Sequence, residues 1–295
     1  MYLLVNQDKI IEIFCNCDDF SKVFDTFLQR KFVSNKKTTN KPGLAISEIM
    51  SIAICYHLSG IKCFQYYYTM VVSKKMKHLF PKAPSYNRFI ELLSRCSMHL
   101  FVFIHKMNTR KYGLYYVDSK QIRVCHNLRI FYNRVFKGIA QRGKGSTGWF
   151  YGLKLFMVIN PIGEIVKFSI TRGNVADNNL ERLLVLFRGI SGKVFGDKGF
   201  IVKAKEKLQE NGIQLITKVR NNMKNKLLSL QDKFYLKKRG VIESVFDLLT
   251  TICDIEHSRH RSPANAITHL IAGLVAYNYF EKKPSVFKKS RFLTQ

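Results

Sequence analysis

One stretch, residues 193–200, constrains this chain more than any other. It reads Lys-Val-Phe-Gly-Asp-Lys-Gly-Phe, so a short β-rich run ends in a carboxylate, Asp197, that lies near two glycines. A strand that carries an acidic side chain to its tip, with glycines that allow another group to approach, suits a metal or phosphate site. The run 114–118 has the same design and ends in Asp118. The sequence therefore predicts a sheet whose strand ends present carboxylates.

A third carboxylate, Glu243, lies in a helix predicted over residues 239–252. Carboxylates from two strand ends and a helix can hold two divalent cations about 4 Å apart, and hard cations such as Mg²⁺ prefer carboxylate oxygen. Two such ions activate an attacking oxygen and stabilise a leaving oxygen, which is the chemistry of phosphodiester cleavage. The alternative for Glu243 is an exposed ladder with Arg239 and Asp247, spaced by four residues, worth a few tenths of a kcal/mol per pair. Three other acidic residues remain open as the third ligand: Asp247, Asp254 and Glu256.

For a single aspartate at a strand end, capping a turn is the ordinary role. The surrounding charge favours the metal interpretation here, because residues 119–163 contain eight Lys or Arg and no Asp or Glu. The whole chain carries 49 basic and 20 acidic residues, a formal net charge of +29, and its last fourteen residues, 282–295, contain five basic residues and no acid. Self-repulsion of this size favours a polyanionic partner, and nucleic acid is the partner we expect.

The basic segment 134–149 is the first candidate for that contact. Its basic residues alternate with glycines: Arg134, Lys137, Arg142 and Lys144. Backbone amides freed by glycine, together with such side chains, bind phosphates. Residues 138–144 match the first seven positions of a P-loop, but Gly145 replaces the Ser or Thr that holds Mg²⁺, so we predict contacts to the DNA backbone rather than a nucleotide site. We expect Trp149 and Phe150 to be buried in the sheet, with stacking on an exposed base as the alternative.

Other predicted DNA contacts lie next to the acidic residues. Lys198 and Arg239 flank the carboxylates in sequence, and a cluster follows the helix of Glu243: His257, Arg259, His260 and Arg261. Cys253, His257 and His260 are spaced loosely like zinc ligands, but no second cysteine pair accompanies them, which argues against a zinc site. The cluster is therefore expected to face phosphates.

The order of the predicted elements indicates three regions. Residues 1–112 contain short helical patterns with tight breaks, typical either of a helix-turn-helix-like DNA-binding region or of a plain helical bundle. Residues 113–281 give three strands, then alternating helices and strands, and then the helix of Glu243, which predicts an α/β domain with a mixed sheet flanked by helices. This order resembles ribonuclease-H-like cores, and the resemblance implies that the first and fourth strands lie side by side, which would bring Asp118 and Asp197 together although 79 residues separate them (197 − 118). Residues 282–295 form a basic tail.

Several classes of protein are excluded by composition. No run of 18 or more apolar residues is present, and the start lacks the pattern of a signal peptide, so we expect no membrane association. The seven cysteines are scattered and odd in number, which fits the cytoplasm better than a disulfide framework.

A set of motifs then carries a resemblance to a known family: Asp118-Ser119-Lys120, Val124-Cys125-His126, Phe136-Lys137-Gly138-Ile139-Ala140, Gly196-Asp197-Lys198-Gly199-Phe200, Ile242-Glu243-Ser244 and Glu256-His257-Ser258-Arg259-His260-Arg261-Ser262. From about residue 40 to Lys283 the chain resembles the DDE transposases of bacterial insertion sequences, most closely the group typed by insertion sequence 982. Two departures, Phe200 where Tyr is common and Gln121 where Pro is common, leave the carboxylates untouched.

The resemblance implies a ribonuclease-H-like fold in which Asp118, Asp197 and Glu243 form a catalytic triad that binds two Mg²⁺ or Mn²⁺ ions. It also implies recognition of terminal inverted repeats, strand cleavage, and transfer of the 3′-hydroxyl into target DNA, by a homodimer on paired ends in the bacterial cytoplasm, associated with the nucleoid. Two alternatives remain. One is a nuclease of the same fold that does not transfer strands, and the other is an inactive or domesticated copy that only binds DNA.

Overall fold

The computed structural model describes residues 6–31, 43–107, 109–110, 112–145, 148–201, 205–218, 228–256 and 260–287. The chain divides into two compact units, which we describe separately. The helical unit contains residues 1–107 and 249–279, and the sheet unit contains residues 108–248 and 280–295. Among the described residues, no helix has both the length and the apolar character needed to cross a membrane.

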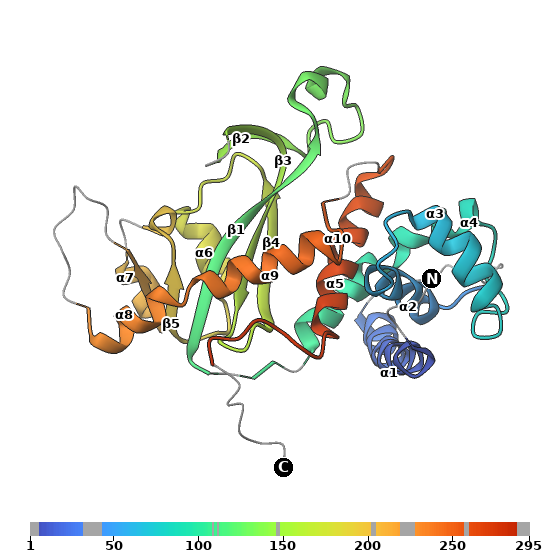
Figure 1. Ribbon diagram of the computed structural model, residues 1–295, viewed down its shortest axis with the longest axis horizontal. Coiled ribbons are helices and arrows are strands. Elements are labelled where there is room, and N and C mark those ends of the chain that lie inside the picture. Colours follow the sequence, from blue (N-terminus) through green and yellow to red (C-terminus); the bar gives the residue numbers. More distant parts are fainter. Residues whose placement is uncertain are drawn as a thin grey trace, which may run out of the picture. The chain divides into compact units, whose positions relative to one another are not determined.

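The helical unit is built from the N-terminal helices and one helix from near the C-terminus (Figure 1). Its elements are α1 (Gln7–Lys31), α2 (Ile46–Leu58), α3 (Phe64–Tyr66), the π-helix η1 (Tyr67–Lys75), α4 (Tyr86–Leu93), the 3₁₀ turn η2 (Ser94–Cys96), α5 (Ser97–Lys106) and α10 (Pro263–Asn278). Helix α1 is continuous over its 25 residues. No Gly or Pro interrupts residues 7–31, so nothing in the backbone stops the helix.

Helix α2 forms the centre of this unit. Almost all of its side chains are buried, and α1 and α10 both pack against it. Its N-terminus is capped by Glu48, whose carboxylate accepts a hydrogen bond from the Ala45 amide at 2.7 Å. Ser47 is buried in the first turn and donates a hydrogen bond to Asp18 at 3.0 Å. A buried central helix is what a helical bundle requires; whether this unit binds DNA stays a prediction.

The sheet unit consists of a six-stranded sheet with helices on both faces (Figure 1). Its strands are β1 (Leu114–Cys125), β2 (Gln141–Gly145), β3 (Gly148–Ile159), β4 (Ile165–Arg172), β5 (Gly192–Gly196) and β6 (Ile213–Thr217). Its helices are the 3₁₀ turn η3 (Asn127–Tyr132), α6 (Leu180–Leu186), the 3₁₀ turn η4 (Lys198–Phe200), α7 (Glu206–Glu210), α8 (Leu230–Lys237) and α9 (Gly240–Thr251).

The order of strands is β2-β3-β1-β5-β6, and β4 also pairs with β3. Strands β1 to β4 pair antiparallel, whereas β1 with β5 and β5 with β6 pair parallel. The mixed sheet is therefore confirmed, as is the prediction that the first strand lies beside the strand that leads to Asp197. The strand over residues 141–145, by contrast, was not predicted.

The two faces of the sheet bury different sets of side chains, as the alternation along a strand requires. Tyr115 and Val117 point into one apolar cluster together with side chains of α6, α7 and the segments beside them. Tyr116 points to the other face, where its ring lies 5.8 Å from that of Phe195, and Phe195 lies 5.9 Å from Tyr235 of α8. By the same alternation Asp118 belongs to the face of Tyr116.

The boundary of the units differs from the predicted one. We expected residues 113–281 to form one domain, but residues 249–279 group with the N-terminal helices. The physical reason is the burial of α10, which packs against α2 and α5 and hides the apolar run 270–277. Of the predicted basic tail, residues 288–295 lie outside the described part of the chain.

Candidate active site

The register of the parallel pair β1–β5 brings the two predicted aspartates to the same level of the sheet. Tyr116 pairs with Phe195, and the same offset, continued by two residues, aligns Asp118 with Asp197. Gly196 makes this close approach possible, because a Cβ atom there would lie 3.1 Å from Val117. Asp197 precedes the turn η4, but its side chain does not cap that turn. The turn-cap role considered for Asp197 is therefore absent.

Arg239 connects the third predicted carboxylate to this site. Its guanidinium donates to Asp118 Oδ2 at 3.2 Å and to Glu243 Oε1 at 2.6 Å, so one cation bridges a strand residue and a helix residue. The helical spacing of four correctly predicted the Arg239–Glu243 pair. The side chain of Arg239 is only 18% exposed because it also reaches Asp118, whereas that of Glu243 is 58% exposed, so the pair differs from a plain surface ladder by its contact with the sheet.

Burial changes the acidity of Asp118. Removal from water raises the pKa of its carboxyl to about 6, and the negative charges of Asp177 and Asp197 act in the same direction. The Ser119 amide, which donates to Asp118 Oδ1 at 2.8 Å, and the charge of Arg239 oppose this rise. An aspartate with an increased pKa beside like charges is typical of functional sites.

Asp177 is a fourth carboxylate at this site that we did not predict. It lies in the turn between β4 and α6 and accepts hydrogen bonds from Ser119 Oγ at 2.7 Å and from Lys154 Nζ at 3.2 Å. A Cβ atom on Gly199 would lie 3.4 Å from its Oδ2 atom, so Asp177 also adjoins the turn that follows Asp197. Its sequence context is that of an ordinary polar turn and gives no signal of this role.

The site fits a hard divalent cation because its candidate ligands are carboxylates, whose oxygens such cations prefer. Each ionised carboxylate also makes ionisation of its neighbours less favourable, and a bound cation would offset that cost. Among the described residues, no three His, Cys, Asp or Glu side chains converge as a ready-made metal site. Arg239 is bound to two of the carboxylates instead, and it supplies the positive charge that this arrangement requires. The acidic alternatives Asp254 and Glu256 belong to the helical unit, where Lys62 lies 3.8 Å from Asp254.

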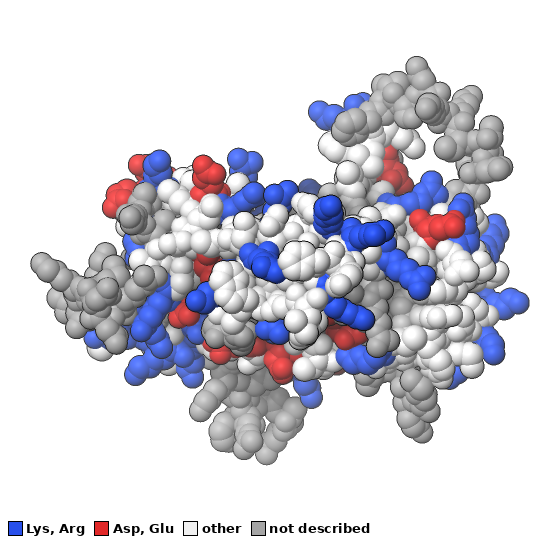
Figure 2. Space-filling model, turned by 90° about the horizontal axis from the view of Figure 1, so that it is seen from above, with Lys and Arg blue, Asp and Glu red and all other residues white. Residues whose placement is uncertain are grey.

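The basic residues predicted beside this site are exposed: Arg134, Lys137, Arg142 and Lys144. Two of the glycines between them, Gly143 and Gly145, lie in strand β2 and pair with β3, so at these two positions the backbone belongs to the sheet. A side chain on Gly143 would collide with the carbonyl oxygen of Gly173, so packing explains its identity. Seen from above, Lys and Arg side chains are spread over the visible face of the molecule and outnumber the acidic ones (Figure 2).

Trp149 and Phe150 differ in their burial. Phe150 is buried, as predicted, whereas Trp149 is 61% exposed, so its predicted burial is wrong. Successive residues of a strand point to opposite faces, so only one of the two can enter the core.

The remaining predicted DNA contacts occupy two places. Lys198 is half-buried in η4, directly after Asp197. His260 and Arg261 belong to the helical unit, where they line a pocket of about 510 Å³ with aromatic side chains. His257 and Arg259 lie outside the described residues.

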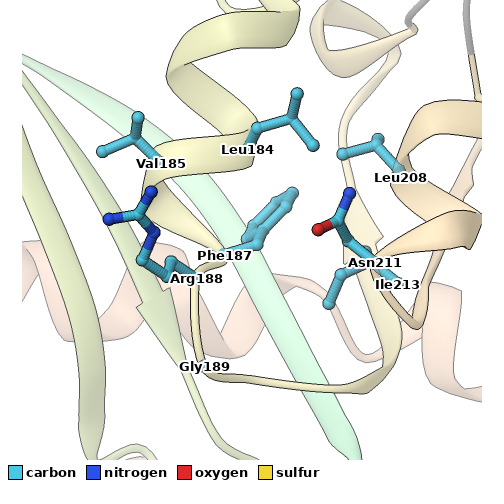
Figure 3. Close-up of a pocket in the computed structure, with 8 residues that line it drawn as sticks. All are labelled: Leu184, Val185, Phe187, Arg188, Gly189, Leu208, Asn211 and Ile213. Atoms are coloured by element: carbon cyan, nitrogen blue, oxygen red, sulfur yellow. The ribbon is translucent and has the colours of Figure 1, made fainter.

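A second pocket, of about 220 Å³, lies in the sheet unit between α6 and the α7–β6 connection (Figure 3). Leu184, Phe187, Leu208 and Ile213 supply its apolar wall, and Arg188 and Asn211 its polar groups. It contains no carboxylate, which distinguishes it from the site of Asp118.

The fold and the site define a class of α/β protein in which neighbouring parallel strands deliver carboxylates to one end of a mixed sheet. The particular family follows from sequence: the profile of the family described as "Transposase DDE domain" matches residues 108–263, more than half of the chain. The protein belongs to this family, which implies an enzyme of the polynucleotidyl-transferase type.

Two further comparisons complete the picture. A search among curated proteins found no match. Among solved structures, the chain is similar to a piggyBac transposase, from a synaptic complex with hairpin DNA, with a TM-score of 0.48 and 12% identity over 90% of this chain and 71% of that one.

Proposed function

We propose that this protein is a transposase that binds the terminal inverted repeats of its insertion sequence and cuts and transfers DNA strands with a ribonuclease-H-like domain. Asp118, Asp197 and Glu243 are the proposed triad. The observation that carries the proposal is the β1–β5 register that aligns Asp118 with Asp197, together with the link from Asp118 through Arg239 to Glu243. The family assignment supports the same reaction class.

The three carboxylates would hold two Mg²⁺ or Mn²⁺ ions. When bound, such ions supply an activated nucleophilic oxygen and stabilise the leaving oxygen of the phosphodiester. Ligation requires the ionised form of Asp118, whose pKa burial raises to about 6 in the metal-free protein, so protons compete with the ions at this carboxyl and metal affinity should decrease as pH falls. In the metal-free protein the single positive charge of Arg239 offsets part of the negative charge of Asp118 and Glu243.

The basic residues would position the DNA backbone across this site. Arg134, Lys137, Arg142 and Lys144 are exposed and belong to a segment that contains no acid. Lys198 and Arg239 flank the carboxylates, and His257, Arg259, His260 and Arg261 are the proposed contacts at the end of helix α9. Contacts of this type fix the register of DNA without reading its sequence. A homodimer on paired ends and a bacterial origin in the insertion-sequence-982 group belong to the same proposal.

The test is cleavage of a labelled duplex that carries the ends of the element, with Mg²⁺, by the wild type and by Asp197→Asn. We expect cleavage at the element boundary by the wild type alone, while both proteins bind the duplex. Glu181→Gln, an exposed acid on helix α6, is the matched control and should cut normally. Equal cleavage by wild type and Asp197→Asn would refute the triad.

Two alternative functions have different outcomes in the same experiment. A nuclease without strand transfer would cut the duplex but give no joined products in a plasmid target. A protein that only binds DNA would cut neither substrate, and its stability would not respond to Mg²⁺. Joined products exclude both alternatives.

A further inference from the structure

The connection between β1 and β2 carries three large apolar side chains that are among the most exposed of the described residues in the sheet unit. We call residues 126–140 the aromatic arm. Leu128, Phe131 and Tyr132 lie in its 3₁₀ turn and are 81%, 86% and 84% exposed. The arm projects beyond the end of β1 (Figure 1). Contiguous exposed apolar groups of this kind mark an interaction site.

The shape of the arm is fixed by contacts at both of its ends. At the start, Asn127 donates to the carbonyl of Trp149 at 2.8 Å, and the Leu128 amide donates to the ring of His126 at 3.4 Å. At the other end, Phe136 is buried, and its carbonyl accepts a hydrogen bond from Tyr151 at 3.3 Å. The two ends of the arm are therefore held by these contacts, while the apolar side chains of its tip remain exposed to solvent.

The charge of the arm and its surroundings identifies the class of partner. Residues 127–145 contain five Lys or Arg and no acid. The guanidinium of Arg142 lies 5.7 Å from the ring centroid of Phe131, and the ammonium of Lys144 lies 5.9 Å from that of Trp149. A second copy of the same positive arm would be repelled, whereas a polyanion that offers flat aromatic groups would be attracted by both features. DNA with unstacked bases is such a partner.

We propose that the aromatic arm binds unpaired or unstacked DNA bases by stacking them on Phe131 and Tyr132. This inference rests on the proposed function, since it assumes that DNA is the substrate. With Arg142 on one face of Phe131, the opposite face is the one available to a base. Stacking on aromatic side chains tolerates any base, so the arm selects distorted DNA rather than a sequence.

The selectivity has a physical origin in the duplex itself. Bases inside intact DNA are already stacked on their neighbours, and exposing one costs a few kcal/mol. In a mismatched bubble the bases are already unpaired, so exposing one of them costs the protein much less free energy. Because stacking on one aromatic side chain contributes about 1–3 kcal/mol per base, we expect the wild type to prefer a bubble over the intact duplex by about tenfold or more.

The experiment measures dissociation constants by fluorescence anisotropy for a plain duplex and for the same duplex with a three-base mismatched bubble. The wild type is compared with the double variant Phe131→Ala, Tyr132→Ala. Both side chains are exposed, so the fold should persist. Phe234→Ala is the matched control, because Phe234 of α8 is 51% exposed and also lies near a lysine, Lys238, at 5.6 Å. Phe131→Trp with Tyr132→Trp tests whether an aromatic face alone restores binding.

We expect the alanine variant to lose about tenfold affinity for the bubble and to keep its affinity for the duplex, with the control unchanged and the Trp variant restored. Equal losses on both probes, or no loss on either, would overturn the proposal. A change in oligomeric state with unchanged preference for the bubble would assign the arm to contacts between copies and would also overturn it. These binding assays need no cleavage, so a protein that cuts no DNA but prefers the bubble refutes the proposed activity and leaves this inference standing.

Discussion

Replacing Asp118 by asparagine should stabilise the metal-free protein at pH 8. The carboxyl has a pKa of about 6 in the folded protein and an ordinary value of 3.8, and its side chain is only 21% exposed. At about 1.4 kcal/mol for each factor of ten in the ionisation constant, holding Asp118 ionised in the folded state costs about 3 kcal/mol. Asparagine keeps the shape of the side chain and removes the charge that causes the cost.

The sign of the pH dependence follows from linkage. Between pH 3.8 and 6 the folded protein binds more protons at Asp118 than the unfolded chain does, so the stability of the wild type decreases as pH rises through this range. The advantage of Asp118→Asn should therefore be below roughly 1 kcal/mol at pH 4, roughly 2 kcal/mol at pH 5 and about 3 kcal/mol at pH 8. Urea unfolding with EDTA present, at pH 5 and pH 8, measures both values.

Two controls make this prediction specific. Asp197→Asn removes an exposed carboxylate, for which burial costs little, and should shift stability at pH 8 much less. Added Mg²⁺ should stabilise the wild type and not Asp118→Asn, because a ligand stabilises only the form that binds it. The reasoning is refuted if Asp118→Asn destabilises the protein at pH 8, or if its effect is the same at pH 5 and pH 8.

Three further perturbations test other parts of the structure. Arg239→Gln removes the cation bound to two carboxylates, so Mn²⁺ affinity measured by calorimetry at pH 8 should increase several-fold; a decrease would show that Arg239 supports the metal instead of competing with it. Arg142→Ala with Lys144→Ala should reduce the log–log salt slope of DNA binding by about 1.8, at about 0.9 per phosphate, and a lysine pair replaced on α8 should leave it unchanged. Gly152→Ala places a side chain against the carbonyl oxygen of Ile122 in the β1–β3 pair, so urea unfolding should show a loss of stability of about 3 kcal/mol or more. In the control Gly240→Ala the new methyl group meets nothing within 4 Å, so this variant should be as stable as the wild type or slightly more stable. Similar stabilities for the two glycine variants would contradict the observed strand pairing.

The pairing of Asp118 with Asp197 could be predicted because it depends on local patterns and on a rule of strand order. Two β-rich runs each end in an aspartate, and in the ribonuclease-H-like cores that the order of elements resembles, the first strand lies beside the fourth. The 79-residue separation is then irrelevant to their distance in space. The strand register of Tyr116 with Phe195 confirms the adjacency that this rule predicted.

The surroundings of the pair could not be predicted in the same way. Asp177 is in a turn whose composition is that of any polar connection, and only the fold brings it to Ser119 and Lys154. Gly143 was assigned to a phosphate-binding loop because freed amides and close strand packing both require glycine. The sequence alone does not show which of these two requirements applies at Gly143. The close approach to the carbonyl oxygen of Gly173 shows that it is strand packing.

The helix of Glu243 shows the same division between local and tertiary information. Helical spacing correctly gave the Arg239–Glu243 pair but indicated an exposed ladder, because the partner in the sheet is 121 residues away from Arg239. The contact with Asp118 shows that Arg239 belongs to the carboxylate site and not only to a helix surface. A half-buried aspartate beside two further carboxylates is unfavourable without a cation, and the chain supplies one from Arg239, in the turn directly before the helix that carries the third proposed ligand. Arg239 therefore offsets part of the negative charge of the site in the metal-free protein, and the Arg239→Gln variant tests whether it competes with a divalent ion for the same carboxylates.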